Sequence, residues 1–403
     1  MKAQENGSSI FRNLTVLSIE QALSLPFFTY RLVQEGMRVI RVEPPGRGDP
    51  NRYVGTDVLG EEAMGSYFLP YNAGKESITL NLASEEGRGI LHRLVAELPV
   101  DIFASNTRPM NYARLGIDYE TLRQLKPDLI WVGVTGFGPD IDEPAYDPIL
   151  QARAGYMDLT GEPDRPPQLF GLPMADMGVA EHGYGQVMKA LFQRAVSGEG
   201  SRIDVAMYDS VISWTVIPFT MARTFGTVMK RTGNTHQFYA PASMFPSADG
   251  YVFVAVGSDQ QWAQLTRMPE FAPLAREEYR HNAGRSANAQ TLNRELAEIT
   301  RTRTAAEVAP FFAEAGIPFS KIYTLPEVVE DPFAESKLLS ASDPRTGLRV
   351  EMPPPPVMTP FLQEEHMAFS FAPRLGEHNH RIYGETLGYN PVEIAAFHQR
   401  GII

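Results

Sequence analysis

The stretch "LTVLSIEQALSLPFFTYRLVQEGMRVIRVEPP", residues 14–45, decides the fold of the first half of the chain. It begins and ends with short apolar runs rich in β-branched residues, which are typical of buried strands. Between them lies a helix-length segment in which Pro26 suits the first turn and Gly36 the C-terminal stop. A strand, a helix and a strand at this spacing predict two parallel strands joined by a right-handed crossover.

The same alternation continues downstream. A helix is expected near 84–97, a strand at 100–105 in "VDIFAS", a helix at 111–125 and a strand at 129–138 in "LIWVGVTGFG". Repeated units of this kind build an open α/β sheet with helices against its faces. The first half of the chain is therefore predicted to be an α/β domain.

The pattern changes after residue 220. The sequence "ASMFPSADGYVFVAVG", residues 242–257, predicts a hairpin whose two apolar runs meet at Asp249 and Gly250. Helices are expected at about 259–267, 288–301 and 304–316, so this part reads as a smaller α+β domain. The Pro-rich segment 340–360 is predicted to be an extended connector, and helical periodicity returns at the end of the sequence.

The composition narrows the classes of function. The net charge of −12 weighs against a broad nucleic-acid-binding surface. The sequence has no cysteine, which excludes disulfides, thiolate metal sites and a cysteine nucleophile. The first residues, "MKAQENGSSIFRN", lack the apolar core of a signal peptide, and no run approaches the ~18 apolar residues that a membrane helix needs. We expect a cytoplasmic protein with neither nucleic acid nor membrane as a partner.

Two common kinds of cofactor site find no support in the motifs. A dinucleotide site needs G-x-G-x-x-G after the first strand, whereas the turn here, "SIEQALSLP", has no glycine. Without those glycines we interpret Glu43, at the end of the second strand, as a surface carboxylate. His378 and His380, beside Glu377, are the best metal candidates, but their spacing puts both on one face only in a strand. A redox cofactor and a metal site are therefore both disfavoured.

A carboxylate in "PQLFGLPMADMGVAEHGYGQVMKAL", residues 167–191, is the leading candidate for chemistry. Asp176 stands at or just before the start of a helix, among Pro, Met, Ala and Gly. One interpretation is an N-cap that accepts a backbone N–H. The other is a nucleophile: the helix N-terminus favours the ionised form, an apolar surround raises the pKa, and a poorly hydrated carboxylate can attack an activated acyl group. The two roles are compatible.

Asp147, in "PAYDPILQARAGYMDLTGEP", is a second candidate, and its alternative is a turn-starting Asp before Pro148. Basic residues in the α/β half could bind an anion near the strand ends, where such sheets take their ligands. Each of them alone is better explained as a solvated surface residue, but together they lie near the predicted strand ends. The candidates are Arg41, Arg47, Lys75, Arg108 and Arg114.

In these residues and their order, the chain resembles the family III CoA-transferases, typified by formyl-CoA transferase and the carnitine CoA-transferase. The resemblance extends over nearly the whole sequence and rests on an ordered set of landmarks. These are "RVIRVEPPGRGDPNR" (38–52), "YNAGKESITLNL" (71–82), "SNTRPMNYARLGIDYETLRQLKPDLI" (105–130), "GFGP" (136–139), "PAYDPILQARAGYMDLTGEP" (144–163), the segment 171–210, "GNTHQFYAPASMFPSADGYVFVAV" (233–256) and "PRLGEHN" (373–379).

The resemblance implies an α/β fold with a Rossmann-like, CoA-binding large domain at 1–220, a small α+β domain at 221–328 and a segment, 329–403, that returns to the large domain. It implies a homodimer of interlocked rings. The family aspartate falls on Asp176, which would form an anhydride and then an aspartyl-CoA thioester. Coenzyme A would enter as a thioester substrate, passing from an acyl-CoA donor to a carboxylic acid acceptor, with no metal or redox cofactor.

The resemblance also assigns binding residues. Asn106, Arg114 and Lys75 fall on family positions that contact CoA, and Arg41 and Arg108 are expected to join them. Tyr146 and Asp147 fall on the segment that borders the active site. Two departures stand out: Pro44 replaces a basic residue that some members carry, and "THQFYAP" replaces a glycine-rich lid. We therefore expect His236, Gln237 and Tyr239 to line the active site.

Related α-methylacyl-CoA racemases share the fold and use a histidine in a G-H-D segment as a proton-transfer base. The matching residues here are Ala145, Tyr146 and Asp147, and a phenol is a poor base near pH 7. This favours a transferase. A racemase or isomerase using the same CoA site, and a non-catalytic CoA-binding subunit, stay as alternatives.

Overall fold

The computed structural model describes residues 9–403, which form two compact units. The larger unit takes in the described chain up to Ala154, then Gly171–Phe219 and Pro332–Ile403. The smaller unit takes in Gly155–Phe170 and Thr220–Asp331. The sequence had placed 155–170 in the large domain. The segment belongs to the smaller unit because Arg231 donates hydrogen bonds to the carbonyls of Asp158, Glu162 and Arg165.

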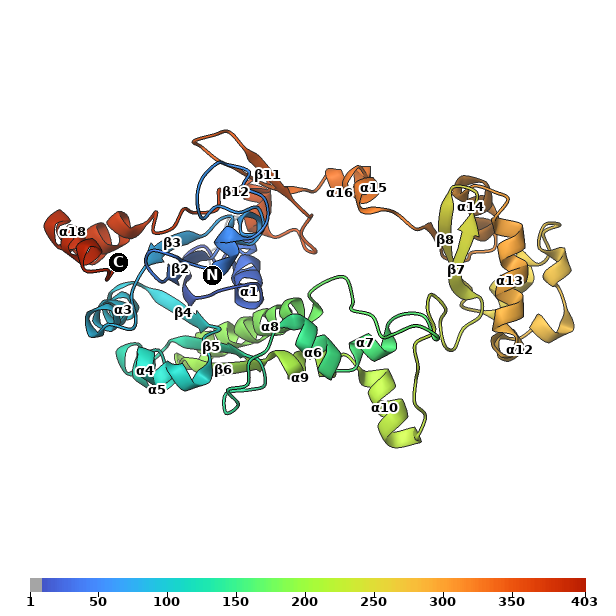
Figure 1. The fold of residues 1–403 in the computed structure, drawn as a ribbon, viewed down its shortest axis with the longest axis horizontal. Coiled ribbons are helices and arrows are strands. Elements are labelled where there is room, and N and C mark those ends of the chain that lie inside the picture. The colour runs from blue at the N-terminus through green and yellow to red at the C-terminus, as the bar shows by residue number, and fades with distance from the viewer. Residues whose placement is uncertain (1–8) are drawn as a thin grey trace. The chain divides into compact units, whose positions relative to one another are not determined.

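The centre of the larger unit is a six-stranded parallel sheet, as predicted (Figure 1). Its strand order, β3-β2-β1-β4-β5-β6, is that of a doubly wound dinucleotide-binding fold. The strands are short, and β1 and β5 are buried along nearly their whole length, which accounts for their apolar runs. They are β1 (Thr15–Ile19), β2 (Arg38–Glu43), β3 (Glu76–Thr79), β4 (Val100–Ser105), β5 (Ile130–Thr135) and β6 (Ser201–Ala206).

Helices cover the sheet and begin where the chain supplies a cap. Ser84 caps α3 (Glu85–Glu97) by accepting the N–H of Gly87, and α1 (Ser24–Gln34) ends before Gly36, whose φ is 92°. The longest helix, α8 (Met174–Ser197), packs against α1. The other helices of this unit are α2 (Leu69–Asn72), α4 (Tyr112–Leu115), α5 (Tyr119–Leu125), α6 (Asp147–Arg153), α9 (Met207–Ser213), α16 (Pro332–Glu335), α17 (Pro360–Glu364) and α18 (Pro391–Gln399).

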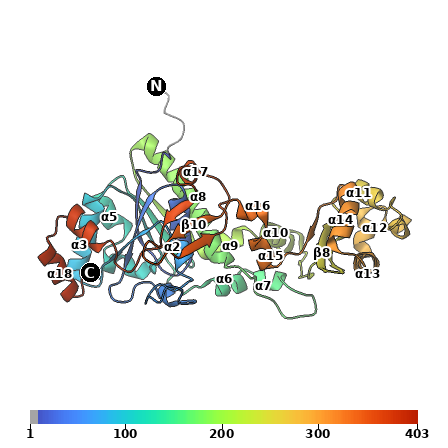
Figure 2. The same ribbon diagram turned by 90° about the horizontal axis from the view of Figure 1, so that it is seen from above.

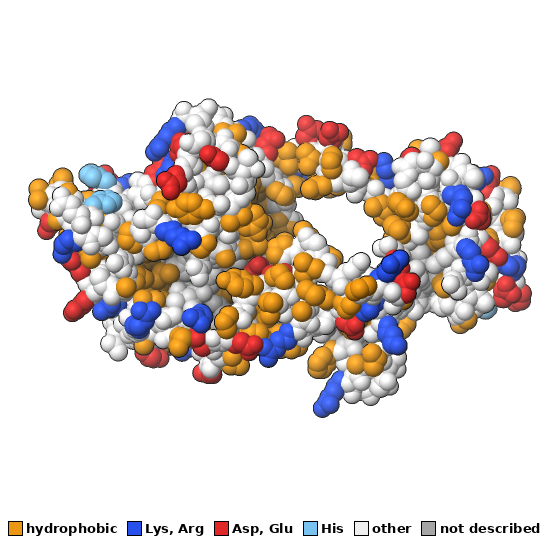
Figure 3. Space-filling model, viewed as in Figure 1, with side chains coloured by type: hydrophobic (Ala, Val, Ile, Leu, Met, Phe, Trp, Pro, Cys, Tyr) orange, Lys and Arg blue, Asp and Glu red, His pale blue; other side chains and the backbone are white. Residues whose placement is uncertain are grey.

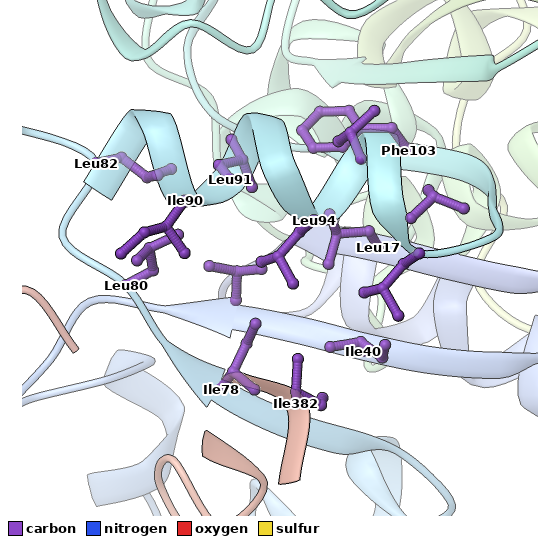
Figure 4. Close-up of a cluster of buried hydrophobic side chains, with 14 of the residues drawn as sticks. Leu17, Ile40, Ile78, Leu80, Leu82, Ile90, Leu91, Leu94, Phe103 and Ile382 are labelled. Carbon is purple, nitrogen blue, oxygen red and sulfur yellow. The ribbon is translucent and has the colours of Figure 1, made fainter. Parts of the chain in front are cut away.

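One apolar core lies between the sheet and α3 (Figure 4). Strand residues such as Leu17 and Ile40 meet Ile90 and Leu94 of the helix. Ile382, from the C-terminal segment, packs into the same cluster. The core of the larger unit is therefore built from segments that are far apart in the sequence.

The C-terminal segment is fastened along the outer strand β3. His378 N–H donates to the carbonyl of Ser77 at 2.9 Å, and the hydroxyl of Tyr383 donates to the carbonyl of Thr79 at 2.7 Å. Farther on, α18 lies beside α3, and Arg400 pairs with Glu86 (Figures 1 and 2). These bonds satisfy backbone groups that would otherwise be exposed at the sheet edge. A turn of π-helix (His380–Thr386) precedes α18.

Two local predictions were wrong. The helix expected at 111–125 is two short helices, α4 and α5, because Gly116 adopts a φ of 66° and Asp118 starts the second one as its N-cap. The segment 340–360 is not a plain connector. It contains β10 (Leu339–Ser342) and β11 (Arg349–Met352), which form a small sheet with β12 (Ala368–Ser370).

The smaller unit contains the predicted hairpin, β7 (Ala242–Ser247) and β8 (Gly250–Ala255), extended by β9 (Phe319–Lys321). Its three predicted helices are present as α11 (Asp259–Leu265), α13 (Ala289–Thr300) and α14 (Ala305–Glu314). They pack on the sheet through a separate apolar core that includes Trp262 and Phe312. Further helices are α7 (Tyr156–Leu159), α12 (Asn282–Ala287) and α15 (Leu325–Val329), and α10 (Val216–Phe225) enters this unit from the larger one.

A buried ionic cluster supports the carboxyl ends of β1 and β2. Arg52 holds Glu43 through two bonds of 2.7 Å, and Arg41 lies 3.2 Å from the same carboxylate and donates to Asp49 at 2.9 Å. The side chains of Arg41, Glu43 and Arg52 are all 0% exposed. The interpretation of Glu43 as a surface carboxylate was wrong, because Arg52 from the loop after β2 and Ser77 from β3 join Arg41 in holding it inside the protein.

We predict that Glu43→Gln destabilises the protein by about 3–5 kcal/mol, because it leaves two buried guanidinium groups short of a charge. Arginines and a Ser77 hydrogen bond outweigh burial and lower the Glu43 pKa to about 2, so its contribution is present above pH 4.5 and disappears toward pH 2. Glu97→Gln, which breaks an exposed pair with Arg93, is the control and should cost under about 1 kcal/mol. Urea denaturation followed by circular dichroism measures both. Equal losses would contradict the assignment.

Candidate active site

A cavity of about 480 Å³ opens at the carboxyl edge of the large sheet. The residues that follow four successive strands line it: Gln21 after β1, Asn106 after β4, Gly136 after β5 and Met207 after β6. Asp176, from the start of α8, lines it too. Strand order reverses between β1 and β4, which is where doubly wound sheets bind ligands. The fold therefore brings Asp176 to the expected ligand edge.

A second cavity extends the first toward β2. It is lined by Val42, Pro44, Gly48 and Asp49, and it shares Gln21, Asn106, Thr107 and Arg108 with the cavity of Asp176. Two adjoining cavities along one sheet edge suit a long ligand whose reactive end lies at Asp176.

The turn after β1 is fixed by side chains instead of glycines. Asn106 bonds both to the N–H of Gln21, at 3.2 Å, and to its carbonyl, at 2.8 Å. Asp49 accepts the next N–H, that of Ala22, and Asn51 donates to the carbonyl of Ala22. Ala22 is held at a φ of 61°, a conformation that residues with a side chain rarely adopt. Because both N–H groups are occupied, this turn does not present them to a pyrophosphate.

Asp176 is the third residue of α8 and not its N-cap, so that interpretation was wrong. The N-cap is Pro173, which forms no side-chain cap bond. The carboxylate of Asp147 takes that role: its Oδ1 accepts the N–H of Ala175 at 2.6 Å and, more weakly, that of Asp176 at 3.4 Å. Asp147 itself begins α6, next to Pro148. The side chain of Asp176 is therefore not needed to cap its own helix.

The pKa of Asp176 is raised to about 7, first by burial and then by the negative charge of Asp147. From the sequence, the helix N-terminus was expected to lower the pKa of Asp176 and an apolar surround to raise it. In the structure, the effect of burial is the larger. Asp176 in turn affects two phenols: burial first, then Asp176 and Asp147, raise the pKa of Tyr67. Burial, Tyr67 and Asp176 raise that of Tyr71. A carboxylate in such a dry setting is more basic than usual.

The residues expected to bind CoA divide into two groups. Arg108 and Asn106 line both cavities, and Arg108 lies 3.3 Å from Asp142 with its side chain 55% exposed. Lys75 and Arg41 are buried in the ionic cluster, where Lys75 donates to Glu20 at 2.8 Å. Burial lowers the pKa of Lys75 to about 8.

Arg114 lies on α4 and donates to Asn111. Asn106 and Arg108 therefore line the cavities, whereas Lys75 and Arg41 are buried and bind Glu20 and Asp49. A contact between CoA and Lys75, Arg41 or Arg114 stays a prediction.

Tyr146 and Asp147 lie beside Asp176, Tyr146 as a lining residue of the cavity and Asp147 as the cap of α8. Over α6 the surface shows hydrophobic side chains (Figure 3). Tyr146, just before this helix, and Ile149, within it, are both exposed. An exposed apolar surface beside a cavity is a common mark of a binding region.

The remaining predicted residues belong to the smaller unit. His236 and Tyr239 line a cavity of about 400 Å³ there, with Gly257 and Gln261. The Nδ1 atom of His236 accepts the backbone N–H groups of Phe238 and Tyr239, and Gln237 donates to the carbonyl of Lys230. His236 therefore has its proton-bearing nitrogen, Nε2, on the other side of the ring. Their role at the active site stays a prediction.

The lining or neighbouring residues that were missed from the sequence include Gln21, Tyr67 and Tyr71. Gln21 could have been found, because it directly follows the first strand and so had to reach the ligand edge. Nothing in the sequence pattern tied Tyr67 or Tyr71 to Asp176. Within residues 9–403 no group of three or more His, Asp or Glu side chains is placed to hold a metal ion, and no helix of this part is long and apolar enough to cross a membrane.

Comparison with known proteins identifies the class. The family model described as "CoA-transferase family III" matches residues 11–379, so the protein is an enzyme of the CoA-transferase class, which uses CoA thioesters. The chain belongs to CoA-transferase family III. It is 31% identical to succinyl-CoA–D-citramalate CoA-transferase of Chloroflexus aurantiacus over 97% of both chains. It is 32% identical to succinyl-CoA:mesaconate CoA-transferase of Haloarcula marismortui, over 84% of this chain and 87% of the other.

Solved structures agree on the fold. A CaiB/BaiF family protein from Brucella suis superposes with a TM-score of 0.79 at 32% identity, covering 93% of this chain and 98% of the other. The α/β fold with a parallel central sheet is thereby confirmed.

The raised pKa of Asp176 predicts a pH-dependent effect of Asp176→Asn on stability. A carboxyl group with a pKa near 7 in the folded state and near 3.8 in the unfolded state costs stability increasingly as the pH rises from 4 to 7. The variant should match the parent at pH 4 and exceed it at pH 8 by on the order of 2 kcal/mol, since the cavity admits some solvent. Asp118→Asn, at the cap of α5, should show no such gain. Thermal unfolding at both pH values tests this, and equal stability at pH 8 would refute it.

Proposed function

We propose that the enzyme moves CoA from an acyl-CoA donor to a carboxylic acid through covalent intermediates on Asp176. The carboxylate of Asp176 attacks the thioester carbonyl, so a C–O bond forms and the C–S bond breaks. CoA departs as the thiolate, and the acyl group stays on Asp176 as a mixed anhydride. The thiolate then attacks the Asp176 carbonyl, which releases the donor acid and leaves CoA as a thioester of Asp176. The acceptor carboxylate reverses these two steps, so the new acyl-CoA departs and Asp176 is restored.

The observation that carries this proposal is a largely desolvated carboxylate at the ligand edge of the sheet. Its raised pKa makes Asp176 a better nucleophile than an ordinary surface Asp, because nucleophilicity increases with basicity. The described residues that line the cavity include no cysteine and one serine, Ser24, whose hydroxyl oxygen accepts a 3.4 Å hydrogen bond from the Asn106 amide.

The lining of this cavity also argues against racemisation. Among the described residues that line it, no histidine is present, and Tyr146 stands where a racemase would have one. Racemisation at a carbon next to a thioester needs a base on each face, and a phenol is a poor base near neutral pH. Asp142 and Glu143 also line the cavity, but each is paired with an arginine, Asp142 with Arg108 and Glu143 with Arg153, so Asp176 is the lining carboxylate best suited to attack.

We place the CoA moiety along the two adjoining cavities, with Arg108 as its exposed cationic contact. Lys75 and Arg41 would serve the site from within, through Glu20 and Asp49, next to the turn at Gln21. His236, Gln237 and Tyr239 are proposed to complete the active site, on the strength of their sequence position. The proposed assembly is a homodimer, which exposed apolar side chains on α10 support, among them Val216 and Phe225.

The proposed acceptor is a dicarboxylic acid. The two relatives above are named for transfer from succinyl-CoA to D-citramalate or mesaconate, and another, from Agrobacterium fabrum, for succinate and glutarate. All of these acids carry two carboxyl groups, and a second carboxylate offers the site a charge to recognise.

We predict that Asp176→Asn and Asp176→Ala lower kcat by about 10⁴-fold or more, because the bond-forming oxygen is lost. Incubation with succinyl-CoA, trapping with hydroxylamine and mass spectrometry of the digest should locate the modification on the peptide containing Asp176. Glu181→Gln, on the same helix but paired with Arg31, is the matched control and should keep its activity. Modification elsewhere, or activity in the Asp176 variants, would disprove the mechanism.

A panel of acids tests the acceptor. With succinyl-CoA as donor, dicarboxylic acids of four or five carbons should give kcat/KM values at least about tenfold above those of monocarboxylic acids of equal length, because only they present a second charge. Liquid chromatography of the acyl-CoA products measures each rate. A preference for monocarboxylic acids would refute this substrate class while leaving the covalent mechanism intact.

A further inference from the structure

Asp147 is hydrogen-bonded to the start of α8, whose own N-cap residue, Pro173, forms no side-chain cap bond. Its Oδ1 accepts the N–H of Ala175 at 2.6 Å and that of Asp176 at 3.4 Å, and its Oδ2 accepts Nε2 of Gln151 at 2.6 Å. Gln151 also donates to the carbonyl of Leu172, just before the helix. Asp147 is 7% exposed, so these bonds form in a largely dry setting. Together they tie α6 to the backbone that carries Asp176.

Because Asp147 caps α8, the side chain of Asp176 is not needed to bind the N–H groups of its own helix. An Asp in the first turn of a helix commonly folds back onto free N–H groups, and here Asp147 occupies those of Ala175 and Asp176. No side-chain cap bond comes from Pro173. The carboxylate of Asp176 therefore faces the cavity that it lines.

The two carboxylates also repel each other, and the charge of Asp147 adds to burial in raising the pKa of Asp176. Repulsion of this kind acts on a free carboxylate and not on an ester, anhydride or thioester, because acylation removes the negative charge of residue 176. The protein thus makes the free enzyme less favourable relative to its acyl form.

Resting on the proposed function, we propose that Asp147 is a positioning residue with two effects on the reaction. Its hydrogen bonds hold the backbone of Asp176 so that the nucleophile faces the thioester. Its charge favours the uncharged acyl forms of Asp176 over the free carboxylate.

Other groups near Asp176 must be considered in reading its titration. The phenols of Tyr67 and Tyr71 reach it from the side of α2. The neighbouring helix α1 contributes Arg31, which pairs with Glu181 farther along α8. The loops that line the cavity contribute four further charged or titratable side chains, Arg108, Asp142, Glu143 and Tyr146. The lining residues of β5 and α9 are Val134, Thr135 and Met207, which do not titrate.

Asp147→Asn separates the two effects, since an amide oxygen can still accept the N–H of Ala175 but carries no charge. Without that charge the pKa of Asp176 falls, so the acidic limb of kcat/KM for the acyl-CoA should move to lower pH by about 0.5–1 unit. The equilibrium amount of trapped acyl-Asp176 should fall several-fold. Asp147→Ala should show the same shift together with a further loss of kcat, of about tenfold, because the backbone is released.

Asp118→Asn is the matched control: it alters the carboxylate cap of α5, which does not line the cavity, and should leave the pH profile unchanged. Gln151→Met keeps both carboxylates but removes the neutral donor to Asp147 and, with it, the bond to the carbonyl of Leu172. The negative charge then acts more fully on Asp176, and the limb should move to higher pH. This variant tests the sign of the effect even if the Asp147 variants fail to fold.

The outcomes separate this inference from the proposed function. If Asp176→Asn retains activity and forms no adduct, the covalent mechanism fails and the role of Asp147 with it. If Asp176→Asn is inactive while the Asp147 and Gln151 variants keep the parental pH profile and adduct level, the mechanism stands and the role of Asp147 is overturned.

Discussion

The larger unit depends on one buried interaction, the two-pronged contact between Arg52 and Glu43. It joins the end of β2 to the loop that follows, and Arg52 also reaches the carbonyl of Pro373 in the C-terminal segment. Arg41 extends the cluster to Asp49, which holds the turn after β1. Both guanidinium groups lie over the ring of Phe68. A charged cluster without access to water is tolerated only when every member is paired, so the geometry of this sheet edge is closely specified.

That specification explains why the ligand edge of this doubly wound fold does not offer the backbone site that a dinucleotide cofactor uses. In dinucleotide enzymes the first turn is open and rich in glycine, so that phosphates reach the backbone. Here Asn106 and Asp49 occupy the same backbone N–H groups, and the proposed reactive group, Asp176, comes instead from the start of α8. The switch point of the sheet keeps its role as the ligand edge, while in the proposed mechanism a side chain takes the part of a cofactor.

Much of the fold could be predicted, because local signals agreed with the tertiary structure. Pro26 and Gly36 bounded α1, and Asp249 with Gly250 marked the hairpin of the smaller unit. The predictions failed where the answer lay in distant contacts: Glu43 looks exposed until Arg52 is placed, and 340–360 looks like a linker until β12 pairs with β10.

The candidate site divides in the same way. Asp176 could be singled out by its chemistry and by resemblance, since carboxylates among apolar residues are uncommon. Its contact with Asp147 could not be predicted. Pro, Met and Gly around the start of α8 give no clear capping signal, and the side chain that caps the helix comes from α6. Tyr67 and Tyr71 carry no local signal either, because only the folded chain brings them near Asp176.

The way the C-terminal segment covers β3 has a consequence for the order of folding. The bonds of His378 and Tyr383 to that strand, and the bond from the Asn81 N–H to the carbonyl of Ile402, join parts of the chain separated by the whole smaller unit. Contacts of such long sequence separation form late, because a large loop must first be closed. During synthesis the sheet edge at β3 thus stays uncovered while residues 220–331 emerge and fold on their own core. The larger unit is therefore completed last. Until the C-terminal segment binds, the edge of β3 is open to pairing with strands of other chains.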